Sequence, residues 1–292
     1  MFYQGDQLLK LCADEQCTIS DVMIQQESHM FEMDEKAVLE RMQNQWEVMQ
    51  KGIHQAMTEE LTSMGGLIGG EGRKLLVRSE SGTALPGSLV TKAMAYAMGL
   101  LEVNASMGIV VAAPTAGSCG ILPGTLKAMQ EAYGWRDEQV VAGIFNAAAI
   151  GSIIVHQATV AGAEGGCQAE TGSAAAMAAS AICELMGASP ETSLHAAAIA
   201  LKNVMGQVCD PVAGLVESPC QKRNGIGAAN ALISAEMALA GIKSLIPFDE
   251  VVVAMGEVGR SLPESLRETA KGGIATTPTG CRIKERVLAN NG

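Results

Sequence analysis

The sequence predicts a mainly α-helical protein, a single helical domain whose functional loops are rich in glycine and proline. Hydrophobic residues make up 48% of the 292 residues but aromatic residues only 3%, so alanine, aliphatic residues and 17 methionines must fill the core. Small residues of this kind suit helices that pack closely together. Alternating β-branched patterns are nearly absent, and 33 glycines and 9 prolines separate apolar runs of helical length.

The first part of the chain is predicted to form an outer helical layer. Residues 19–62 have helical periodicity, with Ser20 as a candidate N-cap and Asp21 in the first turn. One face carries the apolar residues Val38, Leu39, Met42, Trp46, Met49 and Ile53, and the other face carries charges. We therefore expect the N-terminal segment 1–65 to pack on the remainder of a single domain spanning 1–292.

Glycine-rich loops punctuate the rest of the chain. The stretches "SMGGLIGGEG" and "SESGTALPGSLV" predict loops before a helix over Val90–Leu101. The run "GIVVAAP" is the one convincing strand-like segment. Near the C-terminus, "GGIATTPTG" predicts a loop and "CRIKERVLANNG" a final helical turn or a fraying tail.

Charge and hydropathy exclude several classes of protein. The net charge of −11, with no more than two consecutive basic residues, argues against a nucleic-acid partner. The uncharged stretches Val103–Leu126 and Val140–Ala163 are long enough to span a membrane, but both contain polar or Gly/Pro interruptions and lack flanking basic or aromatic belts. The N-terminus also lacks a signal-peptide pattern, so we expect a soluble, cytoplasmic protein, with a membrane helix bundle as the alternative.

The loop "APTAGSCGILPG" combines Thr115, Gly117 and Ser118 just before a helix predicted to begin near Ile121. Free N–H groups at a helix N-terminus, beside hydroxyl groups, favour a small anion such as a carboxylate. The alternative is a tight turn capped by serine. No GK[ST] sequence follows, so the loop is not a P-loop.

Three cysteines lie in polar, glycine-rich loops: Cys167 in "GAEGGCQAETG", and Cys209 and Cys220 in "CDPVAGLVESPC". The positive end of a helix beside Cys167 would favour its thiolate. Three thiolates suit a soft metal, although the spacing is neither that of a zinc finger nor that of a ferredoxin, and buried structural thiols are the alternative. A four-iron cluster held by three thiolates would leave one iron free to act as a Lewis acid on a substrate oxygen.

Further candidates are weaker. His156 lies in an apolar helical stretch and is either a core residue or a general base. Lys202, about two turns before Cys209, could neutralise a carboxylate. Cys281 is either a surface thiol or a fourth ligand, and Cys183 is expected in the core.

The three loop motifs, in this order and spacing, resemble the α chain of the bacterial iron–sulfur L-serine dehydratases (L-serine ammonia-lyases) of the two-subunit type. The segments "TISDVMIQQE" and "LRETAKGGIATTPTG" resemble that family too, so the likeness covers nearly the whole chain. It implies an oxygen-sensitive 4Fe–4S cluster in a mainly helical catalytic domain, a β-elimination that converts L-serine to pyruvate and ammonia, and a role in serine catabolism and gluconeogenesis. The implied cluster ligands are Cys167, Cys209 and Cys220, and the implied substrate contacts are Thr115, Ala116, Gly117 and Ser118.

Two departures from the family pattern bear on the site. Some single-chain relatives place a C-terminal cysteine on the open iron, whereas Cys281 is followed by eleven more residues. Single-chain relatives also carry an additional N-terminal domain, which in two-chain relatives is a β subunit, often with an ACT-type module. The resemblance therefore implies a β subunit as partner, an oligomer, and a general base supplied by that partner. The alternatives are a related hydro-lyase acting on L-threonine or a hydroxy acid, and a non-catalytic redox sensor.

Overall fold

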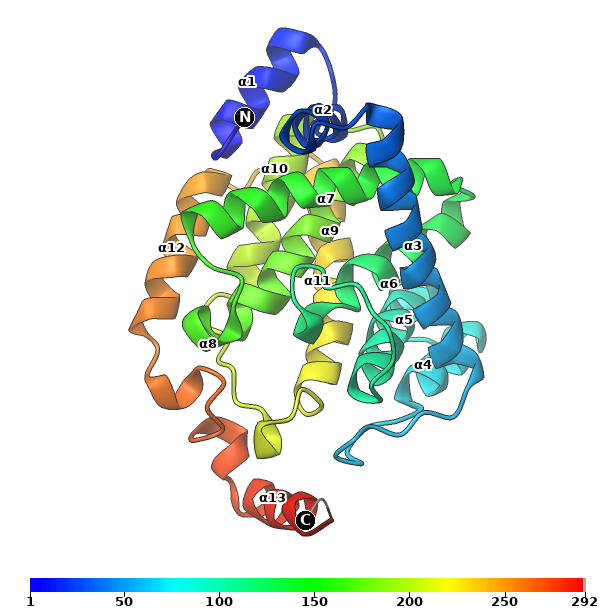
Figure 1. Ribbon diagram of the computed structural model, residues 1–292, viewed down its shortest axis with the longest axis vertical. Helices are drawn as coiled ribbons and strands as arrows, with labels where there is room; N and C mark the ends of the chain where they lie inside the picture. The colour runs from blue at the N-terminus through cyan, green and yellow to red at the C-terminus, as the bar shows by residue number, and fades with distance from the viewer. Residues whose placement is uncertain (291–292) are drawn as a thin grey trace.

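The computed structural model describes residues 1–290 and contains thirteen α-helices in that range (Figure 1). They are α1 (Gly5–Glu15), α2 (Ile19–Phe31), α3 (Glu35–Thr58), α4 (Glu71–Glu80), α5 (Gly87–Ala105), α6 (Ile121–Tyr133), α7 (Asp137–Gln157), α8 (Gly162–Gly165), α9 (Ser173–Leu185), α10 (Pro190–Asn203), α11 (Cys220–Leu239), α12 (Phe248–Ser261) and α13 (Pro278–Asn290). Short turns are η1 (Ala116–Ser118), the π-helical η2 (Gln168–Gly172), η3 (Val212–Gly214), η4 (Glu264–Leu266) and η5 (Gly273–Thr276). The mainly α fold class predicted from the sequence is confirmed.

Helix α9 forms the centre of the molecule and packs against α6, α7, α10 and α11 (Figure 1). Every residue from Ser173 to Cys183 is buried, and most are alanine. Small side chains let neighbouring helices approach closely. On α7, a Cβ added at Gly143 would lie only 2.7 Å from a methyl group of Leu185. This close packing explains how a chain with few aromatic residues fills its core.

Helices α2 and α3 cover α7 and α5, as the amphipathic pattern of the N-terminal segment predicts. The helical character predicted for 19–62 is confirmed for most of the segment, which forms two helices with a turn between Phe31 and Glu35 and is not helical beyond Thr58. The predicted N-cap was wrong. Thr18 caps α2: its hydroxyl accepts from the Asp21 amide, and the Asp21 carboxylate accepts from the Thr18 amide.

A buried indole ties α3 to α7. Trp46 is fully buried and its Nε1 donates to Asp137 Oδ1 at 3.0 Å. The same oxygen accepts from the side-chain amides of Gln50 at 3.1 Å and Gln130 at 2.6 Å. Burial acts to raise the pKa of Asp137, but these hydrogen bonds outweigh it and hold the pKa below its ordinary value. The carboxylate thus contributes stability at neutral pH that is lost only when the pH falls through its lowered pKa.

Asp137→Ala should destabilise the protein by about 1–3 kcal/mol, because the buried Trp46 N–H loses its acceptor. Denaturant unfolding at pH 7 measures this change. Glu138→Ala, which removes an exposed carboxylate from the next position of the same helix, is the matched control and should stay within about 0.5 kcal/mol of the wild type. Equal stabilities of the two variants would show that the Asp137 network contributes nothing.

Four other segments differ from the sequence prediction. The strand-like run 108–114 is irregular, because no strand forms beside it anywhere in residues 1–290. The segment from 281 continues α13 rather than forming a single turn or a fraying tail, as far as the structure describes it. Helices α1 and α4 were not predicted. The start of α4 is held by a remote residue, since the amides of Gly70 and Gly72 donate to Glu102 at 3.0 Å each.

One described helix, α7, is long and apolar enough to cross a membrane by length and composition alone. Of its most apolar window, 67% is buried inside the molecule, which is how the core helix of a soluble protein behaves. The other uncharged stretch, Val103–Leu126, is interrupted by the irregular loop and short turn between α5 and α6.

Candidate active site

The three cysteines of the glycine-rich loops converge at the N-terminal ends of two core helices. Cys167 immediately precedes η2, which leads into α9; Cys220 is the first residue of α11; and Cys209 lies in the loop after α10. Their residues are 2%, 8% and 3% exposed, respectively. The sulfurs lie near enough to one another that Cys167 and Cys220 both act electrostatically on Cys209. Segments 53 residues apart in sequence therefore contribute to one thiol cluster.

The thiols of this cluster favour their protonated form in the metal-free protein. Burial raises the pKa of Cys220 to about 12, and the neighbouring Cys167 adds to the effect. Burial also raises the pKa of Cys167 and Cys209. At Cys167 burial therefore opposes the thiolate that a helix end is expected to favour. A bound cation would reverse this preference.

The loops that carry Cys167 and Cys209 are bonded to each other. The Gln168 amide donates to the Gln207 carbonyl at 3.1 Å, and the Gly206 amide donates to Gln168 Oε1 at 2.8 Å. Thr171 Oγ1 donates to Gln207 Oε1 at 2.8 Å. These hydrogen bonds hold the residues that follow Cys167 against the residues that precede Cys209.

A C-terminal segment, residues 266–274, runs along the Cys209 loop and is called the strap here. The Cys209 amide donates to the Leu266 carbonyl and the Glu268 amide donates to the Cys209 carbonyl, both at 2.8 Å. Asp210 Oδ2 accepts from the Ile274 amide at 2.8 Å. Gly273 has φ +61°, and a Cβ there would collide with Asp210, so the strap can approach only because that position is glycine.

The Cys220 loop is anchored from the opposite side. The buried carboxylate of Glu217 accepts from Ser63 Oγ at 2.5 Å and from the amides of Gly65 at 2.7 Å and Leu67 at 3.1 Å. The glycine-rich segment between α3 and α4 therefore folds around a carboxylate of the cysteine loop, and a Cβ at Gly65 would lie 2.4 Å from Leu215.

The predicted substrate loop is joined to the thiol cluster by Asn224 of α11. Its Nδ2 donates to the Gly117 carbonyl at 2.8 Å, and its Oδ1 accepts from the Gly120 amide at 3.1 Å. Asn224 is fully buried. Sequence reasoning missed this residue and its neighbour Arg223, although both closely follow Cys220 in "CQKRN", because their partners lie elsewhere in the chain.

Glu170 lies between the substrate loop and the thiols. Thr115 Oγ1 donates to Glu170 Oε1 at 2.8 Å and lies 3.1 Å from Ser118 Oγ. A Cβ at Gly162 would lie 2.6 Å from Glu170 Oε2 and 3.3 Å from the Cys209 sulfur, and a Cβ at Gly117 would lie 2.9 Å from Glu170 Oε1. Burial raises the pKa of this carboxyl group. Glycine on both sides thus leaves room for a carboxylate beside Cys209.

Three weaker candidates have other contacts. His156 lies in the last turn of α7, is exposed rather than in the core, and stacks on Tyr3 with ring centroids 4.2 Å apart. Lys202 Nζ donates to the Ser244 carbonyl at 2.5 Å. Cys281 is exposed on α13, with its sulfur 3.7 Å from the Thr276 carbonyl. The core placement predicted for Cys183 is confirmed.

The chemistry of the thiol cluster fits a soft metal centre. Among residues 1–290, no group of three or more His, Cys, Asp or Glu side chains is arranged to hold a single metal ion. Three buried thiols are the kind of ligand that iron–sulfur centres use.

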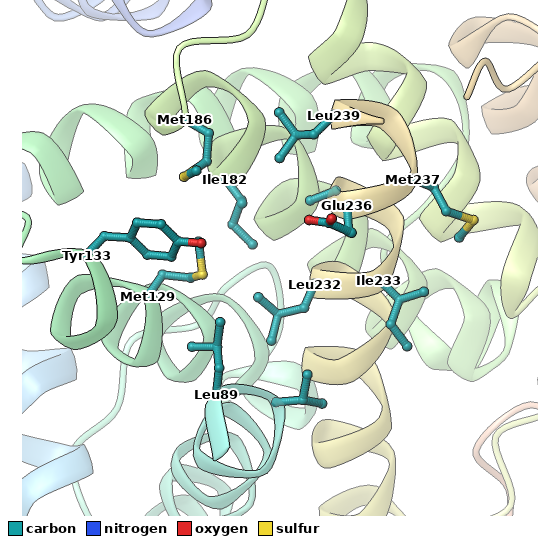
Figure 2. A pocket seen from close by; sticks show the side chains of 12 residues that line it. Leu89, Met129, Tyr133, Ile182, Met186, Leu232, Ile233, Glu236, Met237 and Leu239 are labelled. Carbon is teal, nitrogen blue, oxygen red and sulfur yellow. The ribbon is translucent and has the colours of Figure 1, made fainter. Parts of the chain in front are cut away.

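A separate apolar cavity of about 300 Å³ lies between α5, α6, α9 and α11 (Figure 2). Figure 2 shows Leu89, Tyr133, Met186 and Leu232 around it, with Glu236 as the charged residue of its lining. None of the predicted site residues lines this cavity, so it is distinct from the thiol cluster.

Comparison with known proteins agrees with the motifs. Residues 14–275 match the family model described as "Serine dehydratase alpha chain". This chain belongs to that family. It is 47% identical over 288 residues to the "Probable L-serine dehydratase, alpha chain" of Bacillus subtilis, an alignment that covers 99% of this chain and 96% of that protein.

Two further relatives show how the family is organised. The "L-serine dehydratase, alpha chain" of Peptoniphilus asaccharolyticus is 44% identical, with 99% of each chain covered. The "L-serine dehydratase TdcG" of Escherichia coli is 36% identical over 281 residues, which are 94% of this chain but 61% of that longer protein. This chain thus aligns with nearly the whole of the Peptoniphilus protein and with part of the longer Escherichia coli protein.

Proposed function

We propose that this chain is the catalytic α subunit of an L-serine dehydratase, which converts L-serine to pyruvate and ammonia. The observation that carries the proposal is the convergence of three buried cysteines with a Thr/Ser/Gly loop and one carboxylate. The chain is proposed to act as a single catalytic domain, 1–292, on which segment 1–65 packs; the contacts of α2 and α3 with α7 and α5 support this arrangement.

Cys167, Cys209 and Cys220 are the proposed thiolate ligands of a 4Fe–4S cluster. The three buried thiols are soft ligands of the kind that holds iron–sulfur clusters, which supports this assignment. When bound, such a cluster supplies a Lewis acid that helps hydroxide leave from the substrate. The chain's own contribution is to hold three thiolates in a buried site, from which bulk water is largely excluded.

The remaining site residues would orient an amino acid. Ala116 and Gly117 offer the first N–H groups of a helical turn, which lack partners within it, and Thr115 and Ser118 add hydroxyl groups, so this loop would bind the substrate carboxylate. Glu170 offers a carboxylate for the α-ammonium group. The carboxylate of the amino acid would thus be held by the loop and its ammonium group by Glu170, with the substrate hydroxyl group directed towards the thiol cluster.

The base that removes the α-proton is proposed to come from a β subunit, often ACT-containing in such enzymes. His156 and Lys202 stay as alternatives within this chain, although each already contacts another residue. Loss of the α-proton and of hydroxide leaves aminoacrylate, which tautomerises and hydrolyses to pyruvate and ammonium. The name "alpha chain" of the relatives supports such an assembly, and a cytoplasmic location is proposed with it.

The test is an anaerobic assay of the iron-loaded chain, alone and with its β subunit, with L-serine, L-threonine and malate as substrates. We expect pyruvate and ammonia from L-serine, and at least a hundredfold less turnover without the partner, since a positioned base contributes about 10²–10⁴-fold. Preferred turnover of L-threonine or malate would indicate a related hydro-lyase. A loaded cluster in the complete assembly without any turnover would indicate a redox sensor.

Asn224→Ala should loosen the substrate loop, because the variant removes the hydrogen bonds to Gly117 and Gly120. We expect KM for L-serine to rise about tenfold, which corresponds to the loss of about 1.4 kcal/mol of binding free energy. Steady-state kinetics measure KM, and cluster absorbance checks the metal centre. The control is Asn203→Ala on α10, whose partners Asn230 and Ser234 lie on α11. An unchanged KM in Asn224→Ala would contradict the role of this side chain.

A further inference from the structure

Arg223 of α11 bonds directly to the loop that carries Cys209. It lies three residues after Cys220, and its side chain is only 14% exposed. Nη1 donates to the Val208 carbonyl and Nη2 to Asp210 Oδ1, both at 2.8 Å. Val208 and Asp210 flank Cys209 in sequence. The guanidinium group of Arg223, on the helix that begins with Cys220, therefore bonds to the loop that carries Cys209.

Arg223 follows Cys220 by less than one helical turn, so its charge lies at the end of α11 that carries a proposed ligand. The neighbouring Lys222 has a different environment: its side chain is 52% exposed and pairs with Glu71 at 3.6 Å. Of these two adjacent cations on α11, Arg223 is thus largely buried beside the Cys209 loop, whereas Lys222 faces solvent.

We propose that Arg223 is a positioning residue that holds the Cys209 loop against the helix that begins with Cys220 and sets the reduction potential of the cluster, an inference that rests on the proposed function. A fixed, buried positive charge favours the more negative, reduced state of a nearby electron-accepting centre. The planar fork of arginine also makes two directed hydrogen bonds, which lysine cannot reproduce.

The test compares four anaerobically loaded proteins: wild type, Arg223→Met, Arg223→Lys and Lys222→Met. Redox titration followed by electron paramagnetic resonance gives the midpoint potential of each cluster. For Arg223→Met we expect the equilibrium to shift about tenfold towards the oxidised state, or about 59 mV more negative for a one-electron couple. Arg223→Lys should restore most of the potential, and Lys222→Met, which removes the same charge at the surface, should match the wild type.

The outcomes separate this inference from the function on which it rests. A wild-type chain that binds no cluster overturns the proposed function. A wild-type chain that loads, together with an Arg223→Met potential equal to that of the wild type, overturns the inference alone. If neither Arg223 variant loads, a short bifunctional thiol reagent applied to the metal-free proteins decides: slower cross-linking of Cys209 to Cys220 than in Lys222→Met supports the positioning role, and an equal rate overturns it.

Discussion

Cys167→Ala is expected to abolish both cluster absorbance and turnover. The variant removes one of three thiolates from a site whose other sulfurs sit on separate loops, so the remaining two cannot hold the cluster in place. Loss of the Lewis acid removes several kcal/mol of transition-state stabilisation, which lowers kcat by about a thousandfold or more. The visible absorbance of the cluster after anaerobic loading and the rate of pyruvate formation measure the two losses.

Cys183→Ala is the matched control for this variant. Cys183 is a fully buried thiol of α9, the helix that follows Cys167, and its sulfur lies 3.8 Å from the Ala235 carbonyl. Its removal should cost some stability through a small cavity while leaving cluster absorbance unchanged. A Cys167→Ala protein that is active and fully loaded would remove Cys167 from the ligand set.

Glu170→Gln should raise KM for L-serine by roughly ten- to a hundredfold, because a hydrogen bond between charged groups contributes about 1.5–3 kcal/mol. The substitution keeps the shape of the side chain and its contact with Thr115, so cluster absorbance should persist. Steady-state kinetics with the loaded, complete enzyme measure KM.

Two controls identify the group that Glu170 binds. Glu164→Gln changes an exposed carboxylate six residues earlier and should leave KM unchanged. The inhibition constant of L-alanine should rise in Glu170→Gln by the same factor as KM, whereas that of propionate, which lacks an amino group, should not change. A fall in kcat with constant KM would assign Glu170 to a step other than ammonium binding.

Most of the helical architecture could be predicted because it follows from local periodicity. The alanine-rich stretch of α9 and the amphipathic pattern around Trp46 identify their helices directly. The short helix α4 could not be predicted in this way. Its first amides are held by Glu102, about thirty residues away, and no local pattern reveals such a partner. The run 108–114 has strand-forming residues, but a strand needs a neighbour to pair with.

The site could be predicted to a similar extent. Cysteines in glycine-rich loops are conspicuous in the sequence, so Cys167, Cys209 and Cys220 were identified and the structure brings them together. Arg223 and Asn224 were missed because arginine and asparagine on a helix are ordinary residues until their remote partners are known. His156 illustrates the reverse: a histidine in an apolar stretch is conspicuous, yet the last turn of α7 places it at the surface.

The strap has a consequence for how the protein is made. A ribosome synthesises the chain from its N-terminus, so Cys209 emerges well before residues 266–274, which supply the backbone partners of its loop. Until translation reaches that stretch, the nascent polypeptide exposes unpaired amide and carbonyl groups around this cysteine. Chains that end before this stretch would therefore lack the backbone partners that hold the Cys209 loop in place.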